Sequence, residues 1–433
     1  MTAWSNWAGT ESAAPDRVST PHDVGEILAA VDHARDHQRT VKMAGTGHSF
    51  TAISAPVDAL LRPEGMTGIV AIDRDAMTAT VRSGTPLHVL NAELARLGLS
   101  LHNMGDIAEQ TVAGATSTGT HGTGGRVSSL SAQIEGLTII TGLGEQLTAS
   151  RTSSGEVFEA ARIGLGALGI LTDLTFKVEP LFALAAHDQP MTWDRALATY
   201  DEMTGNHDHV DLYWFPHTEH AMAKVNDRLV DLDDIDPLSR WKHWLDEEFL
   251  SNTVFGAITS FGNRAPGAIP ALNRVSGRAL SERRYSDVAH RVFTSPRRVR
   301  FKEMEYAVPR EVGLEALREV RRTIDASSWR IGFPVEIRSS PADDIALSTA
   351  SGRDSMYLAF HVPAKAAHAD YFAGVEDVLR DFDGRPHWGK MHTRTADELA
   401  GLYPRFEEFL AIREQLDPER LFTNPYLQRV LGD

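Results

Sequence analysis

The chain has 433 residues, of which 42% are hydrophobic and 24% charged, a globular composition that excludes a disordered or collagen-like chain. Its 43 basic and 59 acidic residues give a net charge of −16, which argues against nucleic acid as a partner because phosphate binding requires clustered lysine and arginine. The absence of cysteine excludes disulfides, thiolate catalysis and cysteine-ligated metals. We expect a cytoplasmic enzyme of about two or three domains, without a signal peptide or a membrane span.

The first 180 residues alternate between amphipathic and strand-like segments. Thr20-Pro21 predicts the start of a helix, because a hydroxyl N-cap is followed by proline at the first helical position. Thr85-Pro86 predicts a second start of the same kind. Strand patterns cover residues 40–44, 69–73, 77–82, 137–140 and 170–178, and the second and third of these predict a hairpin. We therefore expect an α+β domain over residues 1–180.

The second part of the chain, residues 181–433, predicts another α+β unit. A helix is expected over 311–324, strands over 333–338 and 356–361, and a further helix over 367–382. This alternation favours a sheet with helices on one face. The C-terminal segment is expected to pack back near the first domain.

Glycine-rich loops are the first candidate binding feature. Gly45-x-Gly47 follows a predicted strand, and residues 103–129 form a long stretch rich in Gly, Thr and Ser. Such glycines let backbone N–H groups approach an anion closely, as a pyrophosphate requires. The dinucleotide fingerprint itself is incomplete, since Phe50 replaces its third glycine. Gly164–Gly169 has the full spacing but precedes a strand, which favours a tight turn.

Two histidines lie inside these loops, His48 and His121. Each could be a solvated or hydrogen-bonding residue rather than a catalytic one. The segment after His121 is similar to a lipase oxyanion loop, but no Gly-x-Ser-x-Gly elbow supplies a nucleophile. No His-Glu-x-x-His motif exists either, so we expect no catalytic metal.

Two clusters in the second domain bring charges together. Glu336 and Arg338 alternate on a predicted strand and share one face, either as a functional pair or as a solvated edge strand. Pro386–Lys390 places an aromatic residue, a glycine and a base within five residues, which is also compatible with a surface turn. Together, Arg338 and Lys390 could supply a positive environment for a developing alkoxide.

Several of these segments jointly resemble one known family. They are Thr40–Phe50 (TVKMAGTGHSF), Asn103–Gly125, Ile163–Ile170 and Pro386–Lys390 (PHWGK). The resemblance is to the aldonolactone oxidase group of the vanillyl-alcohol-oxidase flavoproteins, which includes L-gulono-1,4-lactone and D-arabinono-1,4-lactone oxidases and dehydrogenases and the alditol oxidases. It implies a two-subdomain FAD-binding domain and an α+β substrate domain that caps the flavin.

The resemblance also implies which residues bind the cofactor. His48 matches the family histidine that is bonded covalently to the flavin. The further FAD contacts implied are Met43, Ala44, Gly45, Thr46, Gly47, Ser49, Gly105, Asp106, Thr111, Gly114, Thr118, Gly119, Thr120, His121 and Ile170.

The implied catalytic residues are Glu336, Arg338, His361 and Lys390. By resemblance, Arg338 and Lys390 would hold and polarise the reacting hydroxyl, while Glu336 and His361 would bind the other sugar hydroxyls. Asp106 and Pro363 depart from the alditol oxidase pattern, where a serine and a threonine stand, and this favours a lactone over an open-chain polyol.

Gly105 matches the position thought to control access of O2 to the flavin. We therefore expect an oxidase of sugar-1,4-lactones that produces H2O2, with alditol oxidation or a dye- or cytochrome-linked dehydrogenase as alternatives. A lactone hydrolase that uses His121 and a non-catalytic flavin carrier are the rivals from other classes. The expected partners are a small sugar lactone or polyol and O2. The oligomeric state is left open, and a monomer is compatible with the sequence.

Overall fold

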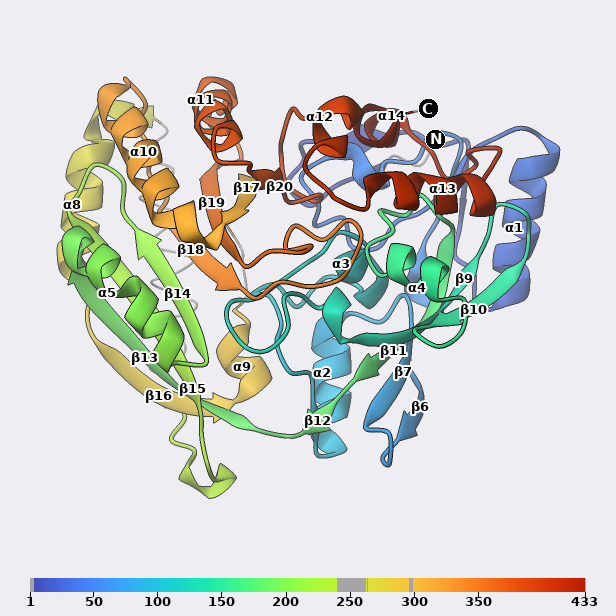
Figure 1. Ribbon diagram of the computed structural model, residues 1–433, viewed down its shortest axis with the longest axis horizontal. Coiled ribbons are helices and arrows are strands. Elements are labelled where there is room, and N and C mark those ends of the chain that lie inside the picture. The colour runs from blue at the N-terminus through green and yellow to red at the C-terminus, as the bar shows by residue number, and fades with distance from the viewer. Residues whose placement is uncertain (1–3, 240–261, 263, 296–298, 433) are drawn as a thin grey trace.

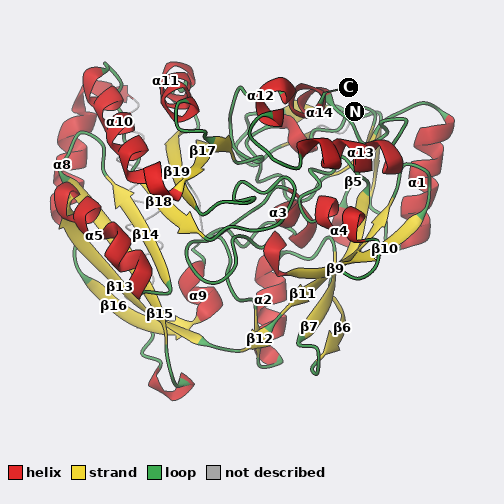
Figure 2. Ribbon diagram, viewed as in Figure 1, coloured by secondary structure: helices red, strands yellow, loops and turns green. Residues whose placement is uncertain are grey.

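The computed structural model describes residues 4–239, 262, 264–295 and 299–432. Two groups of sheets lie side by side, an eight-stranded sheet on the left of Figure 1 and smaller sheets on the right. Helices cover the outer sides of both groups (Figure 2). Among the described residues, no helix is long and apolar enough to span a membrane.

A small parallel sheet opens the first part of the chain. Its strands are β3 (Arg17–Ser19), β5 (Ala59–Leu61) and β4 (Val41–Met43), in that order. The helix α1 (Val24–Asp36) packs on β4 through Ile27 and Val31. The predicted cap at Thr20 is wrong. Asp23 caps α1 instead, because its carboxylate accepts the Glu26 N–H at 2.9 Å, and Thr20 and Pro21 remain outside the helix.

A five-stranded antiparallel sheet forms the core of the first part. Its order is β10 (Gln146–Ser150), β9 (Ile134–Ile140), β11 (Ile170–Lys177), β7 (Thr78–Arg82) and β6 (Ile69–Asp73). The pairing of β6 with β7 confirms the predicted hairpin. The helices α2 (Leu87–Arg96), α3 (Val112–Ser117) and α4 (Gly155–Ala161) bury their apolar side chains in the same core.

The second part is built on one eight-stranded antiparallel sheet. Its order is β16 (Arg283–Val288), β13 (Ala183–Thr192), β15 (His220–Arg228), β14 (His209–Trp214), β18 (Val335–Ser340), β19 (Ser355–Pro363), β17 (Phe301–Pro309) and β20 (Arg385–Pro386). The helices α5 (Trp193–Asn206), α10 (Gly313–Ala326) and α11 (Ala369–Arg380) cover one face (Figure 1). The α+β class predicted from the sequence is confirmed. The prediction that helices cover one face only is wrong, because α9 (Ala289–Phe293) packs on Leu184 and Ala186 of β13, on the face opposite α5.

The two faces of this sheet differ sharply in polarity. On β17, Met304, Tyr306 and Val308 point into the apolar core beneath the helices. Glu303 and Glu305 alternate with them and are therefore on the opposite face, although both are buried. A buried carboxylate requires an ionic or hydrogen-bonding partner, so this face must contain a polar site.

The C-terminal segment packs on the first part of the chain. It contains α12 (Ala396–Ala400), α13 (Phe406–Leu416) and α14 (Pro425–Leu431), and α13 lies against α4 (Figure 1). Phe409 and Leu427 belong to the core cluster that is built around β9 and β11. Asn424 donates to the carbonyl groups of Ala52, Ile53 and Ala55, which fixes the start of α14 to a loop of the first part.

An ion pair joins the two-stranded sheet of β12 and β8 (Leu99–Ser100) to the eight-stranded sheet, where the chain passes from the first part to the second. Glu179 lies on β12 (Glu179–Pro180), and its carboxylate accepts from Arg228 of β15 at 2.6 Å and lies 3.0 Å from His102 Nδ1. Burial alone would raise the pKa of Glu179, but these hydrogen bonds and the Arg228 charge lower it to about 2.

We predict that Glu179→Gln lowers the free energy of unfolding by about 1–3 kcal/mol at pH 7. The depressed pKa means that this contribution is complete above the unfolded-state value near 4.5 and is lost as the pH falls through 2. Urea unfolding of both proteins from pH 7 to pH 2 checks this, with the exposed Glu64→Gln as control. A stability difference that stays constant down to pH 2 would contradict the assignment.

Candidate active site

The first of two adjoining cavities lies among the glycine-rich loops of the first part. It is lined by the end of β4, the loop that follows it, the start of α3 and the start of β11. Gly45 and Gly47 contribute backbone from one loop, and Gly166 and Gly169 from the turn between α4 and β11. The Gly164–Gly169 turn has positive φ at Leu165, Gly166 and Gly169, as the tight-turn interpretation requires.

Glycine is needed at Gly45 for a steric reason. A Cβ atom there would lie 2.4 Å from Oγ1 of Thr111, well inside van der Waals contact. Thr111 is the N-cap of α3 and accepts the Gly114 N–H, so it is not free to move away. The absence of side chains leaves an open cradle of backbone groups at the N-terminal end of α3, which suits a phosphate-bearing ligand.

His48 lies where the first cavity meets the second. Both cavities are lined by His48, Ser49, Gln110 and Thr118. The His48 ring stacks on Trp7 with 5.4 Å between centroids, and its Nδ1 is buried without a hydrogen-bond partner. Burial, and to a smaller extent the Lys390 charge, lower the pKa of His48 to about 4, so the imidazole is neutral at physiological pH.

The second cavity encloses about 520 Å3, the size of a small-molecule site. The polar face of the eight-stranded sheet forms one wall, and the loops around Gly105, His121 and Gly389 form the others. Most of its ionisable wall residues come from β17, β18 and β19 and from the loop after β20, namely Glu303, Glu305, Glu336, Arg338, His361 and Lys390, and Asp106 comes from the loop around Gly105.

Arg338 lies in a row of alternating charges that crosses five neighbouring strands. Arg283 of β16 and Asp188 of β13 pair at 2.8 Å, and Asp188 is directly opposite Lys224 of β15. Lys224 is in turn opposite Asp211 of β14, whose carboxylate pairs with Arg338 at 2.7 Å. Burial alone would lower the pKa of Arg338, but the surrounding carboxylates raise it well above its usual value.

Glu336 completes this arrangement beside the cavity. It accepts from Arg338 Nη2 at 2.6 Å and from the Tyr213 hydroxyl at 2.7 Å. The interpretation of Glu336 and Arg338 as a solvated edge pair is wrong, because β18 is an inner strand between β14 and β19 and both side chains are largely covered. Ion pairing with Asp211, remote in sequence, permits this burial.

Glu303 bridges two further wall residues. Its Oε2 pairs with Lys390 Nζ, and its Oε1 lies 3.4 Å from His361 Nε2. Burial alone would raise the pKa of Glu303, but Lys390 and His361 lower it to about 2, so the carboxylate is ionised. Lys390 also lies 5.0 Å above the Phe50 ring, a cation–π contact at the end of the glycine-rich loop.

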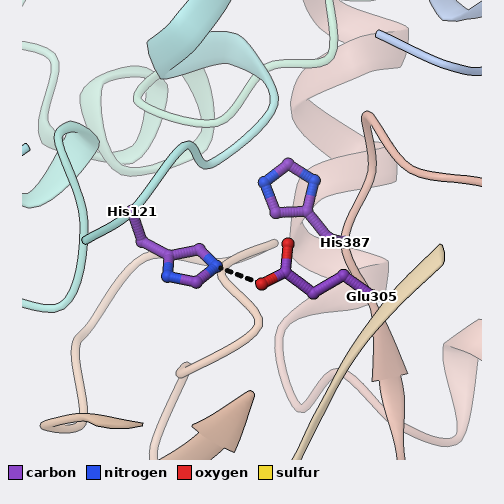
Figure 3. A group of neighbouring side chains, drawn as sticks. All are labelled: His121, Glu305 and His387. Atoms are coloured by element: carbon purple, nitrogen blue, oxygen red, sulfur yellow. Dashed lines mark ion pairs between the residues drawn. The ribbon is translucent and has the colours of Figure 1, made fainter. Parts of the chain in front are cut away.

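A third group, His121, Glu305 and His387, fills the wall nearest the loops (Figure 3). His121 stacks on Tyr357 at 3.7 Å, and its Nε2 lies 3.2 Å from Glu305 Oε1. The spacing would suit a metal ion. However, His387 Nδ1 accepts the Gly389 N–H, and burial lowers the pKa of His387 to about 3. Its neutral ring must therefore hold its proton on Nε2, and with Nδ1 accepting the Gly389 N–H neither nitrogen offers a free lone pair to a metal in this arrangement.

Comparisons with known proteins match both parts of the chain. A family model described as D-arabinono-1,4-lactone oxidase matches residues 174–430, and one described as FAD binding domain matches residues 15–150. The chain is 39% identical to L-gulono-1,4-lactone dehydrogenase of Mycobacterium tuberculosis, over 99% of both chains. The chain belongs to the D-arabinono-1,4-lactone oxidase family.

Other members of this group are similar over the same length. L-gulonolactone oxidase of Bos taurus is 30% identical over 99% of this chain and 98% of its own. Alditol oxidase of a Streptomyces species is 31% identical over 99% of both chains. The crystal structure of cholesterol oxidase from B. sterolicum superposes with a TM-score of 0.85 over 99% of this chain and 96% of that one, at 17% identity, and shares the fold.

This family membership confirms the resemblance found in the sequence. The chain is an oxidoreductase that acts on CH–OH donors and has an FAD-binding domain. The first cavity fits FAD for two reasons. Its wall at Gly45 is backbone with no room for a Cβ atom, and it ends at Nδ1 of His48, which has no hydrogen-bond partner.

The structure divides the sequence-predicted cofactor residues between the two cavities. Those that line the first are Met43, Gly45, Thr46, Gly47, His48, Ser49, Thr111, Gly114, Thr118 and Ile170. Gly105, Asp106, Thr120 and His121 line the second, together with all four predicted catalytic residues. Ala44 and Gly119 line neither. Ala44 is buried against Trp4 and Leu60, and Gly119 makes a positive-φ turn after α3.

Sequence reasoning missed four wall residues, Glu303, Glu305, Tyr213 and His387, and also Asp211, which does not line the cavity but pairs with Arg338. The alternation of acidic and apolar residues over 303–306 was a signal for the first two, since it describes a strand with one apolar and one acidic face. Nothing local marks Asp211, whose role depends on Arg338, 127 positions further along the chain.

We predict that Gly45→Ala prevents stable FAD binding, because its methyl group would collide with Thr111 and disturb the cap of α3. The flavin absorbance per chain after purification measures this. Gly205→Ala is the matched control, since a Cβ there meets no atom within 4 Å and alanine favours the α5 helix. Normal flavin content in Gly45→Ala would show that this loop does not hold the cofactor.

Proposed function

We propose that the protein is an FAD-dependent oxidase of sugar-1,4-lactones that oxidises the C2 hydroxyl and transfers electrons to O2, giving H2O2. The observation behind this proposal is the polar wall of the second cavity, where two cations are held by buried carboxylates beside the cavity that fits FAD. Such fixed charges suit a small substrate with several hydroxyl groups, because each hydroxyl can donate and accept.

Each wall residue has a role in this reaction. FAD supplies the hydride acceptor. Lys390 and Arg338 bind the oxygen of the reacting hydroxyl and stabilise negative charge as it develops there. Glu336 accepts hydrogen bonds from other hydroxyls of the substrate, and Tyr213 keeps this carboxylate in place. Asp211 and Glu303 prevent the two cations from turning away from the substrate.

A lactone is favoured over an open-chain polyol by two observations. Asp106 lines the cavity where alditol oxidases have a serine. Pro363, which stands where they have a threonine, ends β19 and is not among the residues that line the cavity, so it carries no argument about the substrate. Replacing a hydroxyl group by a carboxylate changes which substrate hydroxyls can be bound. The names of the mycobacterial and bovine relatives also refer to a gulonolactone.

The choice of O2 as acceptor rests on Gly105. This glycine lines the second cavity, and a side chain there would meet the His121 carbonyl oxygen at 3.0 Å and Thr120 Cγ2 at 3.1 Å. A side chain is therefore disfavoured at this position, and the cavity wall there is formed by backbone alone. A dehydrogenase that uses a dye or a cytochrome is the alternative, and the name of the mycobacterial relative favours it.

Anaerobic mixing of the holoprotein with L-gulono-1,4-lactone, D-arabinono-1,4-lactone and xylitol tests the substrate. We expect rapid bleaching of the flavin by a lactone and slow bleaching by xylitol, and the reverse would favour an alditol oxidase. Adding air to the reduced protein tests the acceptor. Rapid reoxidation with release of H2O2 is expected, whereas slow reoxidation in air and rapid reoxidation by a dye would identify a dehydrogenase.

We further propose that His48 is bonded covalently to the FAD. The ring is neutral, held by Trp7 and placed at the junction of the two cavities, and its buried Nδ1 has no other partner. A neutral nitrogen has the lone pair that such a bond requires.

We predict that His48→Ala releases its flavin on denaturation, whereas the unmodified protein shows a fluorescent band at the chain mass on a denaturing gel. His33→Ala, on the α1 surface, is the control and retains the band. Flavin that remains bound to denatured His48→Ala would rule out the tether at His48.

A further inference from the structure

The oxidation requires a group that accepts the hydroxyl proton, and most polar groups of the second cavity are already engaged. Arg338 donates to Asp211 and Glu336, and a guanidinium has no lone pair to offer. Lys390 is paired with Glu303 and is likewise a donor. These two cations can stabilise an alkoxide, but neither can take the proton from it.

Most of the remaining acceptors are also engaged. Glu336 accepts from Tyr213 and Arg338 through Oε1, and Asp106 accepts from the Ser295 hydroxyl at 2.8 Å. The second oxygen of Glu336 is the one assigned above to a substrate hydroxyl that is not oxidised. His387 uses its Nδ1 lone pair on the Gly389 N–H. His121 has an oxygen beside each ring nitrogen, the Gly122 carbonyl at 2.9 Å from Nδ1 and Glu305 at 3.2 Å from Nε2, so each nitrogen already faces a protein acceptor.

His361 is different. Its Nε2 faces Glu303 across the β17–β19 pair, where the two residues are directly opposite. A carboxylate accepts only, so this contact holds the proton on Nε2 and leaves a lone pair on Nδ1. Among the described residues, Nδ1 has no hydrogen-bond partner, and the side chain lines the second cavity. Phe301 and Phe333 hold the ring, with centroids 5.2 and 6.1 Å away.

We propose that His361 is the general base of the reaction and that Glu303 is the residue that positions it. The hydroxyl proton passes to His361 Nδ1, the carbinol carbon gives up its hydrogen as a hydride, for which FAD is the acceptor, and the C–O bond becomes C=O. Glu303 fixes the tautomer beforehand and stabilises the imidazolium formed. Because the same carboxylate also pairs with Lys390, one residue sets the distance between the base and the cation that binds the alkoxide.

This inference rests on the proposed function only for the class of donor, a CH–OH compound. Its test therefore uses whichever donor, lactone or polyol, bleaches the flavin of the unmodified protein fastest. If a polyol proves to be that donor, the lactone proposal fails, and the test of His361 proceeds unchanged.

Two variants separate proton transfer from simple hydrogen bonding. We expect His361→Ala to slow flavin reduction by a factor on the order of 10²–10⁴, and added imidazole to restore part of the rate, more for the more basic imidazoles. His361→Gln can bind a hydroxyl but cannot take its proton at neutral pH, so it should be equally slow. A Gln variant near the unmodified rate, or an Ala variant that no imidazole accelerates, would overturn the assignment. Normal flavin content and melting temperature are required of both, and His33→Ala controls for effects of imidazole itself.

Glu303 is tested through its dependence on His361. Glu303→Gln should slow flavin reduction, and the double variant with His361→Ala should be no slower than His361→Ala alone, because the carboxylate acts through the missing ring. If the two losses multiply instead, Glu303 does not act through His361 and the dyad is rejected.

Discussion

The burial of four carboxylates on one face of the eight-stranded sheet is the constraint on which the active site depends. Asp211, Glu303, Glu305 and Glu336 lie on inner strands and are largely buried. Leaving one of them unpaired costs several kcal/mol, so each is matched by a cation, a histidine or a hydroxyl donor from a neighbouring strand or loop. The cations near the substrate are therefore fixed by the same pairs that make the buried face stable.

The two halves of the chain supply different parts of the chemistry. The glycine-rich loops of the first part line their cavity mainly with backbone groups and with few charged side chains, which leaves space for a large cofactor. The sheet of the second part lines the other cavity mainly with side chains, several of them charged. His48 and Ser49 belong to both cavities, so the contact between cofactor and substrate is formed at the end of a single loop. The C-terminal helices return to the first part and hold that loop region through Asn424.

Sequence patterns were sufficient to predict an element or a loop wherever a local hydrophobic period or a motif exists. The hairpin of β6 and β7, the helices α10 and α11 and the glycine loops all have such signals, and all are present. The strands β13 to β17 were not predicted, although short alternations of apolar and charged residues, such as Glu303–Tyr306, are present. What no local pattern shows is that Asp211 and Glu303 are buried. Pairing partners far apart in sequence, such as Asp211 and Arg338, have no local signal, so the neutralisation of the cations emerges only from the register of the strands.

The row of alternating charges from Arg283 to Arg338 has a consequence for how such a site can diverge. Each inner member has an opposite charge on both sides, so a single charge-changing substitution leaves two neighbours uncompensated in a buried layer. Change in this sheet therefore requires coordinated pairs of substitutions on adjacent strands. Uncharged positions of the cavity wall, such as Phe215 and Leu280, are free of that restriction, and new substrate preferences can arise there while the charged layer is inherited intact.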